Sequence, residues 1–146
     1  MSLYLDSSAL VKFVITERES AALRAHVAAV AAPLWTSRLA ATEVGIAAAR
    51  WGAAAASRMD ASHPGELRLP SATARTLPVT GDVLQAATDI GAAQGVRTLD
   101  AIHIATAAAL GSGLVEVVTY DSRMASACRD LGLRVTVPGG DLRPEP

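Results

Sequence analysis

The chain has 146 residues, of which 51% are hydrophobic and 18% charged, so its composition fits one folded domain and excludes an intrinsically disordered chain. Lys and Arg number 13 and Asp and Glu number 14. The formal net charge of −1 excludes a nucleic-acid binder that works through bulk positive charge, although local basic patches stay open.

In chain order, predicted strands and helices alternate. A short apolar run that ends in an acid indicates a buried strand, and Pro and Gly mark where helices and strands stop. The predicted strands are Ser2–Leu5, Leu34–Thr36, Leu77–Val79 at a sheet edge, Val115–Tyr120 and Leu133–Val137. The predicted helices are Ser7–Ile15, Glu19–Ala32, Ser37–Trp51, Ala53–Met59, Asp82–Ala93, Thr98–Leu110 and Ser122–Leu131, and Ala61–Pro70 is predicted as a loop.

This alternation predicts an α/β fold: a single domain over residues 1–146, with a mainly parallel central sheet of four to five strands flanked by helices. Residues 137–146 are a Pro/Gly-rich C-terminal tail.

Charged residues interrupt any signal-peptide apolar region near the N-terminus, and the uncharged run 101–115 is too short to span a membrane. The single cysteine, Cys128, excludes an internal disulfide and a multi-cysteine zinc site. We therefore expect a cytoplasmic protein with no membrane partner.

Four acids are candidate site residues, and two of them follow strands at the sheet edge where ligands bind in such folds. Asp6 and Asp121 follow predicted strands, Asp100 lies in the first turn of a helix, and Glu43 lies in an otherwise apolar helical stretch. One at a time, each has an ordinary explanation as a cap, a helix-dipole partner or a solvated side chain. Together at one sheet edge they would repel one another and raise each other's pKa, unless a divalent cation neutralised them. An oxygen-only ligand set suits Mg²⁺ or Mn²⁺.

The four acids lie in four short motifs. These are Asp6-Ser7-Ser8-Ala9-Leu10-Val11-Lys12, Thr42-Glu43-Val44, Thr98-Leu99-Asp100-Ala101-Ile102-His103-Ile104-Ala105, and Thr119-Tyr120-Asp121-Ser122-Arg123 followed by Leu131-Gly132-Leu133. In order and spacing they resemble the motifs of PIN-domain nucleases, specifically the VapC toxins of bacterial toxin–antitoxin pairs. The resemblance covers nearly the whole chain and is poorest over residues 53–76.

The resemblance implies a PIN-like domain and a metal-dependent endoribonuclease that cleaves RNA by metal-activated water. Asp6, Glu43, Asp100 and Asp121 would then be catalytic and hold Mg²⁺, with Mn²⁺ as the alternative. It also implies a homodimer and a cognate VapB-type antitoxin protein that keeps the toxin inactive.

Other residues of these motifs have secondary roles. Ser8 and Thr119 are candidates to orient a carboxylate or a metal-bound water, with capping or a strand-end hydrogen bond as the alternative. Lys12 and Arg123 are candidate RNA contacts. His103, three residues after Asp100, is expected to have a structural or hydrogen-bonding role.

Two other functions compete with a nuclease. A phosphatase with an aspartyl nucleophile needs a second Asp two residues after the first, where this chain has Ser8. A catalytically silent PIN-like module that binds RNA or protein would not need all four acids.

Overall fold

Strand β1 (Ser2–Leu5) lies near the middle of the sheet, and three of its four side chains have no exposed surface. In the computed structural model, which describes residues 1–141, it pairs in parallel with β2 (Leu34–Ser37) and β5 (Leu114–Val118). Such a strand is covered on both faces, which explains why its sequence is an uninterrupted apolar run rather than an alternating one.

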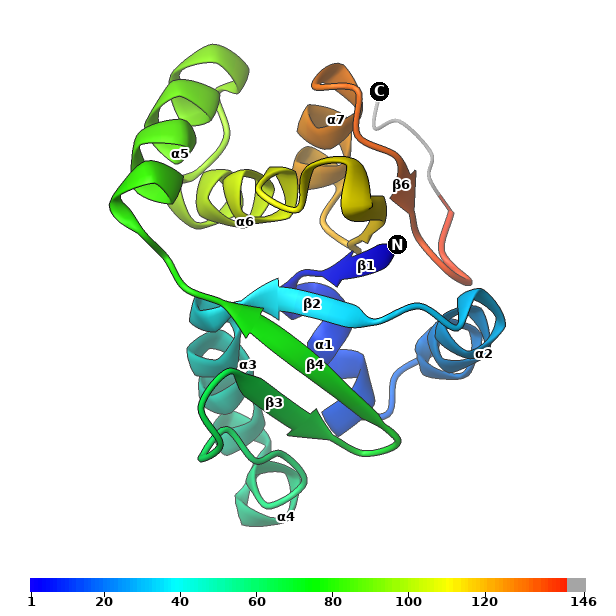
Figure 1. Ribbon diagram of the computed structural model, residues 1–146. Coiled ribbons are helices and arrows are strands. Elements are labelled where there is room, and N and C mark those ends of the chain that lie inside the picture. The colour runs from blue at the N-terminus through cyan, green and yellow to red at the C-terminus, as the bar shows by residue number, and fades with distance from the viewer. Residues whose placement is uncertain (142–146) are drawn as a thin grey trace.

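The described residues form a six-stranded sheet in the order β3-β4-β2-β1-β5-β6 (Figure 1). The remaining strands are β3 (Glu66–Leu69), β4 (Ala72–Leu77) and β6 (Val135–Thr136). Every neighbouring pair is parallel except β3 and β4, which form an antiparallel hairpin. The prediction of an α/β fold with a mainly parallel sheet is confirmed, with one strand more than predicted.

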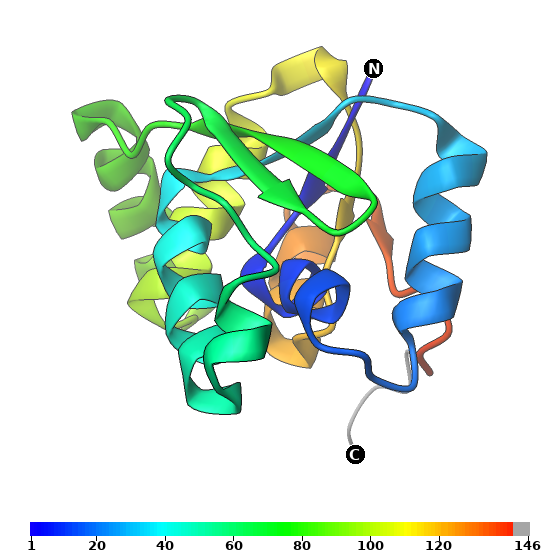
Figure 2. The same ribbon diagram turned by 90° about the horizontal axis from the view of Figure 1, so that it is seen from below.

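Helices cover both faces of this sheet. One face carries α1 (Ser7–Val14), α2 (Ser20–Val30), α3 (Arg38–Trp51) and the short α4 (Ala53–Ala56); the other carries α5 (Gly81–Gln94), α6 (Thr98–Ala108) and α7 (Ser122–Asp130) (Figures 1 and 2). Leu3 and Leu5 point into the core on the first face, while Tyr4 points into the core formed with α6 and α7. Tyr4 thereby reaches toward α6, which matters for the site below.

The predictions fail at the β3–β4 hairpin. The predicted edge strand Leu77–Val79 is instead β4, an internal strand that ends before Pro78, because proline has no N–H for the ladder. The predicted loop Ala61–Pro70 contains β3, whose Leu67 and Leu69 are buried against the core. The two strands meet at a tight turn in which Ser71 has a φ of 61°.

Within residues 1–141, no helix is long and apolar enough to cross a membrane. Cys128 is buried, and burial raises the pKa of its thiol to about 12, so the thiol is unreactive at neutral pH. The last part of the predicted C-terminal tail, 142–146, lies outside the described residues.

Candidate active site

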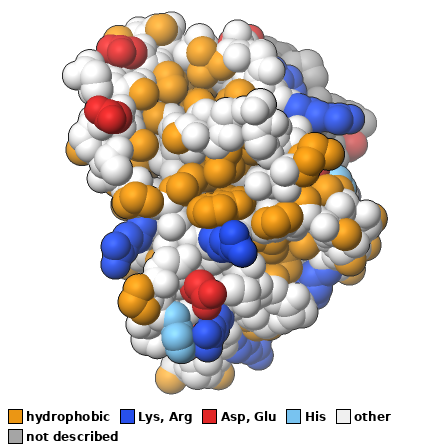
Figure 3. All heavy atoms as spheres, viewed as in Figure 1, with side chains coloured by type: hydrophobic (Ala, Val, Ile, Leu, Met, Phe, Trp, Pro, Cys, Tyr) orange, Lys and Arg blue, Asp and Glu red, His pale blue; other side chains and the backbone are white. Residues whose placement is uncertain are grey.

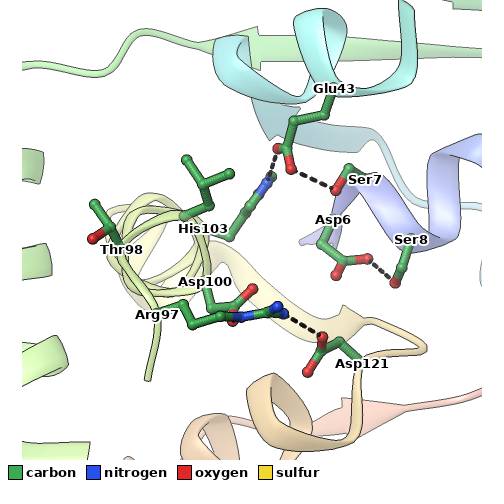
Figure 4. Close-up of a pocket in the computed structure, with 10 residues that line it drawn as sticks. Asp6, Ser7, Ser8, Glu43, Arg97, Thr98, Asp100, His103 and Asp121 are labelled. Carbon is green, nitrogen blue, oxygen red and sulfur yellow. Dashed lines mark hydrogen bonds and ion pairs between the residues drawn. The ribbon is translucent and has the colours of Figure 1, made fainter. Parts of the chain in front are cut away.

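The four predicted acids lie around one pocket of about 500 Å³ at the carboxyl edge of β1 and β5. Asp6 follows β1 and caps α1, and Asp121 follows β5 and caps α7, each through a side-chain oxygen that accepts a backbone N–H. Asp100 comes from the first turn of α6 and Glu43 from the middle of α3. The pocket is lined by Asp6, Ser7, Ser8, Glu43, Arg97, Thr98, Leu99, Asp100, His103 and Asp121 (Figure 4).

Asp6 is the most deeply buried of the four acids, with 3% of its surface exposed. Its Oδ1 accepts hydrogen bonds from Ser8 Oγ at 2.7 Å and from the Ala9 N–H at 3.0 Å, and its Oδ2 accepts one from Thr119 Oγ1 at 2.7 Å. Burial raises the pKa of Asp6, and these donors offset part of that rise. The cause is loss of hydration, whereas the sequence had suggested repulsion between neighbouring acids.

The two hydroxyls that hold Asp6 also join the ends of two strands. Thr119 Oγ1 accepts a hydrogen bond from the Asp121 N–H at 3.1 Å while donating to Asp6. Ser8, from α1, lies 3.4 Å from the same hydroxyl. The orientation of the Asp6 carboxylate is therefore fixed by groups from both sides of the β1–β5 junction.

Glu43 is held by a chain of polar groups that begins deep in the core. Its Oε1 is 2.6 Å from His103 Nε2, and its Oε2 accepts a hydrogen bond from Ser7 Oγ at 3.1 Å. His103 Nδ1 in turn lies 2.7 Å from the Tyr4 hydroxyl, which is fully buried. A carboxylate only accepts, so Nε2 carries the proton that is donated to Glu43, and in the neutral ring Nδ1 accepts from Tyr4.

Burial raises the pKa of Glu43, but donation from His103 and Ser7 outweighs this effect and leaves the pKa below its ordinary value. The expectation that clustered acids raise each other's pKa is therefore wrong for Glu43. His103 does make hydrogen bonds, as expected, but it makes one of them inside the pocket.

Asp100 and Asp121 share a different partner. Arg97 donates from Nε to Asp100 Oδ2 at 3.1 Å and from Nη2 to Asp121 Oδ2 at 3.3 Å. Its side chain is 67% exposed, while those of Asp100 and Asp121 are 14% and 28% exposed. Figure 4 shows the guanidinium lying between the two carboxylates.

The donor set of the pocket suits a hard divalent cation, because four carboxylates and two serine hydroxyls face it and a cationic side chain already lies between two of the acids. Among residues 1–141, however, no three Asp, Glu, His or Cys side chains are grouped so that they could hold a metal ion without moving. The donors that line the pocket nevertheless fit such an ion in their chemistry.

Neither of the two predicted RNA contacts lines the pocket. The Lys12 ammonium is 2.6 Å from Glu17 and 3.0 Å from Glu19, packs over the ring of Tyr120, and does not line the pocket. Arg123 is exposed in the first turn of α7, two residues after Asp121.

Ser7 and Tyr4 were not assigned to the site from the sequence, and no acid was assigned as the partner of Arg97. The pairing of Arg97 with Asp100 at three residues' spacing is the one signal that could have been read from the sequence. The contact between His103 and Glu43 spans 60 residues and joins side chains from two helices that lie on opposite faces of the sheet.

Comparison with known proteins points to one family. A sequence profile of the PIN domain matches residues 3–130. The chain is 40% identical over 139 residues to ribonuclease VapC46 of Mycobacterium tuberculosis strain ATCC 25618 / H37Rv, covering 94% of this chain and 98% of that protein. It is 36% identical over 143 residues to ribonuclease VapC47 of M. tuberculosis strain CDC 1551 / Oshkosh, covering 94% and 97%.

Proposed function

Because the chain belongs to the PIN-domain family and its homologues are VapC ribonucleases, we propose that it is a Mg²⁺-dependent endoribonuclease toxin that a cognate antitoxin neutralises. The observation that carries this proposal is the convergence of Asp6, Glu43, Asp100 and Asp121, from four different elements, on one pocket. A silent binding module has no need for such a cluster, since burying a carboxylate such as Asp6 costs stability unless a ligand offsets it.

The proposed cation is held by these four carboxylates, with Mn²⁺ as an alternative to Mg²⁺. When bound, such an ion lowers the pKa of a water molecule and offsets charge on the phosphate. The protein's own contribution is orientation. Ser8 and Thr119 fix the carboxylate of Asp6, and His103 and Ser7 fix that of Glu43. Two of the four ligands are therefore preorganised.

The proposed partners follow from charge and from exposed apolar surface. An acidic pocket attracts a cationic side chain of an antitoxin, and charge-assisted hydrogen bonds to carboxylates are strong. On α3, Ile46 and Trp51 are 50% and 69% exposed, which favours a protein partner on this helix, either the antitoxin or a second copy of the chain. Arg123, which is exposed two residues after Asp121, is our candidate RNA contact. Because of its two salt bridges, Lys12 could reach RNA only by leaving Glu17 and Glu19.

The test is the Asp6→Asn variant. We expect it to stop RNA cleavage while its circular dichroism spectrum stays that of the wild type, because Asn keeps the cap of α1 but removes a ligand charge. Cleavage at the wild-type rate would overturn the mechanism. Calorimetric titration of the wild type with Mg²⁺ separates the alternatives, since a silent module would bind no metal.

A further inference from the structure

A cation that belongs to the chain already lies in the acid pocket. Arg97 immediately precedes α6, and its guanidinium joins Asp100 and Asp121 through two separate hydrogen bonds. A guanidinium keeps its positive charge in proteins, so Arg97 places a permanent cation between these two carboxylates. At 67% exposure the side chain has room to move away.

The two pairs of acids are held in different ways. Asp6 and Glu43 are fixed by hydroxyl, backbone and imidazole donors that can stay in place when a cation binds. Asp100 and Asp121, in contrast, are tied to a guanidinium, whose positive charge has to give way to another cation at the same oxygens.

Arg97 and a divalent cation would compete for the same carboxylate oxygens. Asp121 Oδ1 accepts the Met124 N–H at 2.9 Å and so caps α7. Its other oxygen, Oδ2, is therefore the one available to a ligand, and that is the atom Arg97 contacts. Arg97 also donates a hydrogen bond to Oδ2 of Asp100.

We propose that Arg97 is a displaceable counter-cation of the Asp100–Asp121 pair: it occupies their oxygens in the metal-free protein, leaves them when the divalent cation binds, and then binds a phosphate of the RNA. This inference rests on the proposed function. Exposed ion pairs of this kind are weak, so displacing the side chain costs little. A guanidinium has five N–H donors in a fork that matches phosphate oxygens, and the released side chain stays beside the pocket.

The test compares Arg97→Gln with the wild type in two binding measurements that need no cleavage. Calorimetric titration with Mn²⁺ at low ionic strength reports the competition, and we expect the variant to bind Mn²⁺ about three- to tenfold more tightly. Fluorescence anisotropy with a labelled single-stranded RNA oligonucleotide in Ca²⁺, its integrity checked on a gel, reports phosphate binding. There we expect the variant to bind several-fold more weakly.

Two further variants act as controls. Arg97→Lys keeps the charge but cannot bridge two carboxylates as a guanidinium does. Its Mn²⁺ affinity should therefore lie between those of the wild type and Arg97→Gln. Arg68→Gln removes an exposed, ion-paired arginine of β3 that does not line the pocket, and it should leave Mn²⁺ binding unchanged.

Tighter Mn²⁺ binding together with weaker RNA binding by Arg97→Gln would support the proposal. Weaker binding of both Mn²⁺ and RNA by Arg97→Gln would show that Arg97 organises the acids, and unchanged Mn²⁺ affinity would show that it does not compete; either result overturns the inference. Tighter Mn²⁺ binding with unchanged RNA affinity would overturn its phosphate role. The proposed function fails separately, if the wild type itself binds no metal.

Discussion

Burial raises the pKa of Asp6, and the donors around it offset only part of that rise. In the unfolded chain this carboxyl titrates near 3.8. Between that value and the higher folded pKa, the folded state holds a proton that the unfolded state has lost. Stability therefore falls as pH rises through this window, and above the folded pKa the penalty is complete. At neutral pH the charged Asp6 therefore lowers the free energy of unfolding of the metal-free protein, and a bound cation would offset this loss.

Replacing this acid should stabilise the metal-free protein. Asp6→Asn cannot ionise, keeps an oxygen for the Ala9 N–H, and caps α1 about as well as Asp does. In EDTA at pH 7 we expect its Tm to exceed that of the wild type by a few degrees, on the order of 2–6 °C. The difference should shrink as pH falls through the titration window of Asp6, because the wild type then regains its proton.

Asp89→Asn is the matched control for this substitution. Asp89 is exposed on α5, so losing its charge should move Tm by less than about 1 °C at either pH. An Asp6→Asn variant less stable than the wild type in EDTA at pH 7 would contradict the argument, and would mean that the three donors do more than offset burial.

Tyr4 should act on the site through His103. Its hydroxyl is fully buried and, by occupying Nδ1, favours the ring tautomer that donates to Glu43. Tyr4→Phe leaves the ring's packing but frees His103 to change tautomer. We expect the single-turnover rate of RNA cleavage to fall about three- to tenfold while the RNA concentration for half-maximal rate stays the same, since Tyr4 does not line the pocket.

The other tyrosine provides the control. The Tyr120 hydroxyl donates to the Pro138 carbonyl at 2.8 Å, so Tyr120→Phe also removes one partly buried hydrogen bond. Both variants should lose about 0.5–1.5 kcal/mol of unfolding free energy, but only Tyr4→Phe should lose rate. Equal rates for the two would show that Tyr4 serves stability alone.

At the scale of elements, the sequence predicts the helices well and the sheet edge poorly. Helix limits such as those of α1 and α7 differ from prediction by only one residue, because caps and breakers are local signals. β3 was missed because its four residues gain strand geometry only by pairing with β4. In the same way, the four acids are visible in the sequence, but the partners of Glu43 are not, because the side chains of Glu43 and His103 come together only in the folded protein.

Helix α2 is attached to the sheet through a buried carboxylate. Glu116 of β5 is 5% exposed, forms a short contact with His26 of α2, and accepts a hydrogen bond from Thr136 at 2.6 Å. His26→Ala leaves this carboxylate with one side-chain donor fewer. We expect the variant to lose about 1–3 kcal/mol of unfolding free energy, measured by urea denaturation.

A double variant tests whether the loss of unfolding free energy comes from the unpaired charge of Glu116. In His26→Ala/Glu116→Gln the group left behind is neutral, so part of the lost stability should return. His63→Ala, which breaks an exposed pair with Asp60, should cost less than about 0.5 kcal/mol. If the double variant is no more stable than His26→Ala, the carboxylate is not what His26 compensates.

For the whole molecule, a net charge of −1 hides an uneven distribution. When the four pocket acids are left out of the count, the chain has 13 basic and 10 acidic residues. In Figure 3, basic side chains gather around the β3–β4 hairpin, where Arg68 and Arg75 are exposed. A near-neutral chain can therefore approach RNA, provided that the acid pocket holds a cation.

A divalent cation should reverse the stability order of the wild type and Asp6→Asn. Binding to the folded state alone adds about 2.7 kcal/mol at a cation concentration 100 times Kd, which corresponds to roughly 5–10 °C in Tm for a chain of this size. The variant lacks one ligand charge, so Mn²⁺ should hardly move its Tm. Thermal denaturation in EDTA, in Mn²⁺, and in NaCl of matched ionic strength would measure this, because screening alone acts in the salt control as well. Equal gains for both proteins would place the cation away from Asp6. No gain for the wild type would mean that the folded protein does not bind it, and the nuclease mechanism would then lose its metal.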